Sequence, residues 1–169
     1  NGNNFVQHTL NTLAPIIAPQ HCYCVLGANA KLITPTLTPT SCTVLVNPNW
    51  AQGMATSINV ACSQLQLQYD ALLLLTCDQV LLTTQDLSAL VLEAQNQPNN
   101  IIAAAYANTV GIPAVIPKAY FSELLGLNGD KGAKAMIQSH LFDVSTVNLP
   151  NAATDIDTHQ QLASFAAKP

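Results

Sequence analysis

The sequence predicts a three-layer α/β sandwich built on a mostly parallel sheet, and three observations support this fold class. Short apolar runs alternate with segments whose apolar residues recur at helical spacing. The apolar run at residues 71–77 ends abruptly in Asp78, as in a central strand that is buried on both faces. The runs at 101–106 and 112–116 are too close in sequence for a crossover helix, so one strand of this pair is expected to be antiparallel.

The remaining elements follow from periodicity, prolines and caps. The predicted strands are residues 21–26, 42–46, 71–77, 101–106, 112–116 and 144–149. The predicted helices are residues 4–13, 52–67, 118–127, 133–140 and 158–167, with one more that begins at Thr83 or Thr84 and extends past Ala94. Pro15 ends the first helix because it cannot continue the hydrogen-bond ladder, and a threonine side chain caps the helix after residue 83.

Length and composition predict one domain over residues 1–169, since 49% of the 169 residues are hydrophobic and can form a full core. Five lysines, no arginine and a net charge of −4 argue against nucleic acid as a partner. No signal peptide and no apolar stretch of membrane-spanning length is visible, so we expect a cytoplasmic protein without membrane contact. The five cysteines lack metal-binding spacing and are expected to be reduced thiols.

Asp78 is the first candidate functional residue. Ligands of open α/β sheets bind outside the carboxyl ends of the strands, and a carboxylate there can hold a divalent cation beside phosphates. The alternative is that Asp78 merely caps the following turn or helix. The pattern alone leaves both interpretations open.

Four stretches together resemble one family. They are 47–57 (NPNWAQGMATS), 76–79 (TCDQ), 111–117 (GIPAVIP) with 129–135 (GDKGAKA), and 155–158 (DIDT). In this order they resemble the molybdenum-cofactor cytidylyltransferase group of the nucleotidyltransferase superfamily, over roughly residues 2 to 166. The resemblance implies a Rossmann-like sheet of the nucleotide-diphospho-sugar transferase type.

The resemblance also implies an activity. Members transfer CMP, or in related enzymes GMP, from the nucleoside triphosphate to the phosphate of molybdopterin, and pyrophosphate leaves. This chemistry uses Mg²⁺ to neutralise phosphate charge. Asp78 would be the first Mg²⁺ ligand and catalytic residue, and Asp157 would be the second, with Asp155 as the nearby alternative. For one of these two late aspartates, the alternative role is a cap of the last helix.

Substrate contacts follow from the same resemblance. Gly53 and Ser57, with Asp78, would lie beside the nucleotide, where free amides of a helix N-terminus are expected after Trp50. The alternative is an ordinary N-capped helix with Met54 packed in the core. Trp50 is either a hydrophobic anchor under the loop or a lid over the ligand, and the anchor is favoured. The acceptor side would be built by two pairs of residues: Gly111 with Pro113, and Lys131 with Lys134. Solvated surface lysines are the alternative for the second pair.

The sequence departs from the family at its beginning. Family members open with a strand and a glycine-rich loop of the type L-A-A-G-x-S-x-R-M-G-x-x-K, whereas this sequence aligns just after that loop. Two function classes therefore stay open: an enzyme using CTP or another nucleoside triphosphate, and a non-catalytic relative that binds nucleotide, pterin or a partner such as a molybdoenzyme or its chaperone. For the sheet we expect that neighbouring strands close together, that another chain fills the space, or that the natural protein carries the strand upstream.

Overall fold

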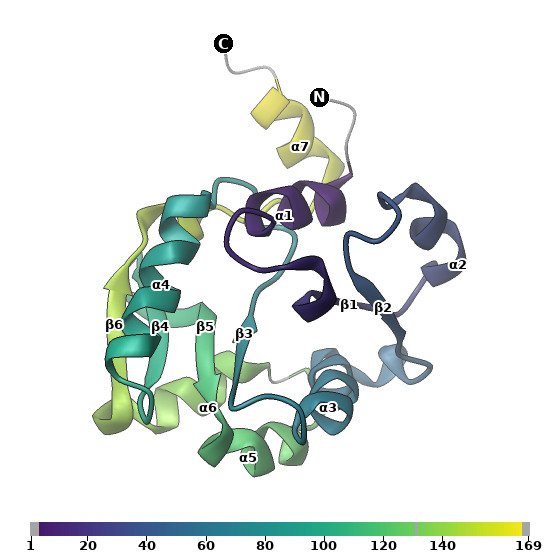
Figure 1. Ribbon diagram of the computed structural model, residues 1–169. Coiled ribbons are helices and arrows are strands. Elements are labelled where there is room, and N and C mark those ends of the chain that lie inside the picture. The colour runs from purple at the N-terminus through teal and green to yellow at the C-terminus, as the bar shows by residue number, and fades with distance from the viewer. Residues whose placement is uncertain (1–3, 131, 167–169) are drawn as a thin grey trace.

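The computed structural model describes residues 4–130 and 132–166 (Figure 1). The strands are β1 (Tyr23–Leu26), β2 (Thr43–Val46), β3 (Ala71–Leu74), β4 (Ile101–Tyr106), β5 (Thr109–Pro117) and β6 (Val144–Asn148). The helices are α1 (Phe5–Leu13), α2 (Ala30–Ile33), α3 (Met54–Leu65), α4 (Thr84–Asn96), α5 (Phe121–Gly126), α6 (Ala133–Ser139) and α7 (His159–Ala166). Every predicted strand and helix has a counterpart, with ends that differ by a few residues.

The strands form two sheets. One has the order β3-β5-β4-β6, in which β5 is antiparallel to β3 and β4 while β6 is parallel to β4. The other is a parallel pair of β1 and β2. The expected mostly parallel α/β fold is therefore confirmed, and so is the strand reversal between residues 101 and 115.

Helices cover both faces of the four-stranded sheet, with α4 on one side and α5 and α6 on the other (Figure 1). Successive residues of β4 point to opposite faces, so each face has its own core. Ile102 packs in the cluster that contains Leu90 of α4, and Ile101 packs in the cluster that contains Leu124 of α5 and Ile137 of α6. These five side chains are completely buried, which gives the three layers their cohesion.

Local chemistry explains two element boundaries. Thr83 accepts the backbone N–H of Asp86, and the Asp86 carboxylate accepts the backbone N–H of Thr83, a reciprocal cap that starts α4. The turn between β4 and β5 consists of Ala107 and Asn108, both with positive φ, as a two-residue hairpin requires.

The expectation of a central strand at residues 71–77, buried on both faces, is wrong in part. β3 ends at Leu74, and within the described residues β5 is its one hydrogen-bonded neighbour. Leu72 is buried, but Leu73 and Leu74 are half-buried and Ala71 is exposed. The physical reason is that the side of β3 away from β5 has no strand against it among residues 4–130 and 132–166.

β1 and β3 are tied together at their beginnings. The Tyr69 hydroxyl, two residues before β3, lies 2.9 Å from His21 Nδ1 and 3.1 Å from the Tyr23 hydroxyl. Both strands thus start at the same end of the molecule, with β3 lying between β5 and the β1–β2 pair (Figure 1). The first expectation for the sheet, that neighbouring strands close together, is wrong, because within the described residues β1 and β3 do not pair.

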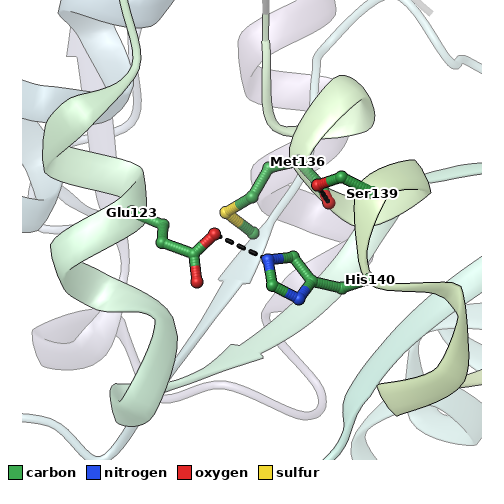
Figure 2. A network of polar contacts seen from close by, with 4 residues as sticks. All are labelled: Glu123, Met136, Ser139 and His140. Carbon is green, nitrogen blue, oxygen red and sulfur yellow. Dashed lines mark hydrogen bonds and ion pairs between the residues drawn. The ribbon is translucent and has the colours of Figure 1, made fainter.

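A polar contact joins α5 to the end of α6 (Figure 2). His140 Nε2 lies 2.7 Å from a Glu123 carboxylate oxygen, and the Ser139 hydroxyl donates to the Met136 carbonyl. This network follows the end of β5 that pairs with Ala71, the first residue of β3. It therefore lies at the opposite end of the sheet from Asp78.

Two further expectations concern cysteines and membranes. All five cysteines are free, as predicted, and burial raises the pKa of the Cys24 thiol to about 12, which disfavours the reactive thiolate. Among the helices of residues 4–130 and 132–166, none combines the length and the apolar character needed to cross a bilayer.

Candidate functional site

The candidate site begins where β3 ends. The Asp78 carbonyl oxygen accepts the backbone N–H of Ile156 at 3.1 Å, so the loop after β3 runs beside the segment at 155–157. The structure thus brings two of the sequence motifs together, although about 75 residues separate them. Asp78 and the two late aspartates belong to one region of the molecule.

The Asp78 carboxylate is incompletely satisfied. Its Oδ1 atom is buried and has no hydrogen-bond partner among the described residues. A buried polar oxygen without a partner costs about 1–3 kcal/mol, and more when it is charged. Such an oxygen is suited to a cation or to a donor group of a ligand.

The pKa of Asp155 is affected by the neighbouring carboxylates. Burial raises the pKa of Asp155, the charges of Asp78 and Asp157 raise it further, and the ammonium of Lys134 lowers it. In the part of the chain that the structure describes, no three His, Cys, Asp or Glu side chains converge to hold a metal ion by themselves. The oxygens still fit Mg²⁺, which is typically bound by one or two carboxylates and completes its octahedron with water and substrate phosphates.

We expect Asp155→Asn to stabilise the protein at neutral pH. The folded-state pKa of Asp155 is raised, so its contribution to stability is fully present below the unfolded pKa and is lost as pH rises through the folded pKa. The neutral amide avoids this loss. The expected gain in the free energy of unfolding is less than about 1 kcal/mol, because the side chain is exposed.

Urea unfolding of both proteins at pH 7 and near pH 4 measures this effect. The advantage of the variant should shrink as the pH falls, because the wild-type carboxyl then becomes protonated too. A variant less stable than wild type at pH 7 would contradict the expected repulsion among the three carboxylates.

Gln79 connects three segments of the site. Its side chain is 6% exposed, and its Nε2 donates to the carbonyls of Ile112 at 3.2 Å and Ala152 at 2.9 Å. Ile112 belongs to β5, and Ala152 precedes the acidic segment. The loop carrying Asp78 is therefore fixed to both neighbours by one uncharged side chain.

The predicted acceptor residues lie together in part. A Cβ built on Gly111 would lie 3.3 Å from Lys134 side-chain carbons and 3.3 Å from the Tyr106 hydroxyl, so the glycine makes room for both. Pro113 is buried two residues further along β5. Lys131 lies outside the described residues. Burial raises the pKa of Tyr106, and the nearby Asp155 and Asp78 raise it further.

Gly53 and Ser57 lie at the start of α3, but their contacts are with the protein. Gly53 has φ +110°, and a Cβ on it would lie 2.3 Å from the Gly129 carbonyl oxygen. That oxygen also accepts the backbone N–H of Ala55 at 3.1 Å, so this amide of the helix N-terminus is already bonded. The glycine thus permits close approach of a loop, and the predicted nucleotide contact of Gly53 and Ser57 stays a prediction.

Asn47 fixes the junction between β2 and α3. It is 1% exposed, and its Nδ2 donates to the hydroxyls of Thr56 at 2.8 Å and Ser57 at 3.0 Å. Trp50 is half exposed, and a Cβ on Gly27 would lie 2.4 Å from the Trp50 Cβ. Trp50 therefore packs over the end of β1 without becoming the buried anchor that the sequence favoured.

The family follows from a comparison along the sequence. Residues 1–144 match the family described as MobA-like NTP transferase domain. The chain belongs to this family. Among curated proteins, the search found no match.

Solved structures show the same fold. Rv0371C from Mycobacterium tuberculosis H37Rv, in a complex with manganese, is 20% identical with a TM-score of 0.80, covering 99% of this chain and 89% of that chain. The 4-diphosphocytidyl-2C-methyl-D-erythritol synthase of Anaerococcus prevotii is 11% identical with a TM-score of 0.75, covering 99% and 88%. Molybdopterin-guanine dinucleotide biosynthesis protein A of Archaeoglobus fulgidus is 13% identical with a TM-score of 0.64, covering 96% and 84%. These neighbours share the nucleotide-diphospho-sugar transferase-like fold of the NTP transferase domain.

Proposed function

We propose that this NTP transferase domain transfers CMP from CTP to the phosphate of molybdopterin, with Asp78 as its central cation ligand. The observation that supports this most is the buried Asp78 Oδ1, which lacks a partner among the described residues and lies beside the segment at 155–157. Asp78 follows the carboxyl end of β3, and ligands of such sheets bind outside the carboxyl ends of the strands.

The roles of the residues follow from their chemistry. Asp78, together with Asp157 or Asp155, would hold Mg²⁺, which when bound offsets the negative charge of the phosphates. Manganese in the Rv0371C complex supports a divalent cation in this fold. Lys134, near the carboxylates, would bind the acceptor phosphate while Gly111 keeps space for its side chain.

The choice of substrates is a finer part of the proposal. CTP over GTP rests on the Gly53, Met54 and Ser57 pattern, and the relative named for molybdopterin-guanine dinucleotide biosynthesis makes GMP transfer the alternative. Molybdopterin as acceptor rests on the motifs at 111–117 and 129–135. We further infer that the 169 residues form a single nucleotidyltransferase-like domain.

A second candidate is a non-catalytic relative that binds nucleotide, pterin or a partner protein. It is favoured by the sequence of 169 residues, which contains no arginine to clamp the triphosphate. Pyrophosphate release from CTP plus molybdopterin separates the two candidates. Binding of CTP without any release would favour the second.

We expect Asp78→Asn to abolish Mg²⁺-dependent CTP binding, because the amide removes the charge that holds the cation. Isothermal titration with CTP in the presence of Mg²⁺, and with GTP for comparison, measures this effect. Asp70→Asn is the matched control, since Asp70 precedes the same strand, is exposed and pairs with Lys118 at 3.5 Å.

The control variant should bind CTP as the wild type does. Unchanged binding by Asp78→Asn would remove Asp78 from the proposed role. Tighter binding of GTP than of CTP would reverse the choice of nucleotide.

A further inference from the structure

The amide of Gln79 is held by two hydrogen bonds beside the candidate site. Both hydrogens of its NH₂ group have carbonyl partners, on Ile112 and Ala152. Exchanging its oxygen and nitrogen would place Oε1 against two carbonyl oxygens, so the network determines the orientation. Its Oε1 is buried and, among the described residues, lacks a donor, as does Oδ1 of the adjacent Asp78.

The loop of Asp78 and the segment of Asp155 lie side by side, since the Asp78 carbonyl oxygen accepts the backbone N–H of Ile156 at 3.1 Å. Asp78 follows β3, which has one strand neighbour in the described part of the chain, so its loop needs support from elsewhere. Gln79 supplies this support from β5 and from the residue three positions before Asp155, and it adds no charge.

We propose that Gln79 is the positioning residue of the cation site, holding the loop of Asp78 and the segment of Asp155 at a fixed separation before any ion binds. This inference rests on the proposed function, because the cation site is its premise. A charged side chain would not serve as well. Lysine would neutralise the carboxylates, and glutamate would add a fourth negative charge and lose both N–H donors.

The test measures the affinity of Mn²⁺ in the presence of CTP by electron paramagnetic resonance, together with the melting temperature. Gln79→Met keeps the length of the side chain but removes both donors. The expected result is a 10–100-fold weaker Mn²⁺ affinity, as is typical when a residue that orients a ligand is lost. Gln64→Met, at an exposed glutamine of α3, is the control and should leave the affinity unchanged.

The outcomes separate this inference from the proposed function. Wild-type Mn²⁺ affinity in a folded Gln79→Met protein would overturn the positioning role even if the melting temperature fell. Mn²⁺ binding that survives Asp78→Asn would overturn the proposed function instead, and the inference with it. If Gln79→Met does not fold, Gln79→Asn keeps the amide one methylene shorter and must still weaken Mn²⁺ affinity, and wild-type affinity there overturns the role.

Discussion

Gly53→Ala is expected to destabilise the protein by about 3 kcal/mol or more. The backbone of Gly53 has φ 110° and ψ 169°, a region that is essentially restricted to glycine. The new methyl group would also lie 2.3 Å from the Gly129 carbonyl oxygen and 2.8 Å from the Asp130 nitrogen. Both are backbone atoms, so no side-chain rotation can relieve the overlap.

Urea unfolding of the wild type and of Gly126→Ala provides the comparison. Gly126 is the last residue of α5, and a Cβ on it would have nothing within 4 Å among the described residues. Alanine there should be neutral or stabilising by up to about 1 kcal/mol, because it lowers the backbone entropy of the unfolded chain. Equal stability of Gly53→Ala and the wild type would contradict the close approach of the two loops.

The same contact links two motifs. The Gly129 carbonyl accepts the backbone N–H of Ala55, so the start of α3 supports the loop that leads into α6. Lys134 is carried by α6 and lies over Gly111. The conformation that only glycine adopts at position 53 therefore helps to place Lys134, the residue proposed to bind the acceptor phosphate, through the loop at Gly129.

Local patterns were sufficient to predict most elements. The reciprocal cap at Thr83 and the turn at Ala107 and Asn108 depend on neighbours in sequence, which is why α4 and the antiparallel β5 could be predicted. The start of α3 was predicted two residues too early, because the contact of Gly53 with Gly129 is between distant segments. Periodicity contains no information about such long-range pairs.

The site could be predicted to a lesser extent. The proximity of Asp78 to the segment at 155–157 matched the resemblance, whereas Tyr106 and the contacts of Gln79 were missed. Gln79 belongs to the motif at residues 76–79, but the sequence does not indicate which carbonyl groups an uncharged amide will contact. Ser57 is still expected beside the nucleotide, and the contact of its hydroxyl with Asn47 was not predicted.

Within residues 4–130 and 132–166, β1 and β3 each have one edge without a strand partner, which leads to the last prediction. β1 (YCVL) and β3 (ALLL) contain no charged residue or proline to protect an edge. Burying an unpaired backbone group costs about 1–3 kcal/mol, which would make a dry interior here unsustainable. Leu73 and Leu74 are only half-buried, and we expect water to reach the open side of the strand and so reduce this cost.

We therefore expect the amides on the open sides of β1 and β3 to exchange with solvent about 10³-fold faster than those of β4, which has a strand on each side. Hydrogen exchange followed by NMR measures this for each residue, and the outward and inward amides of β3 act as internal controls for one another. Equal protection on both sides of β3 would mean that a further strand covers the edge. The remaining expectations, a strand from another chain or from upstream sequence, would then be the ones to pursue, because either would complete the sheet beside Asp78.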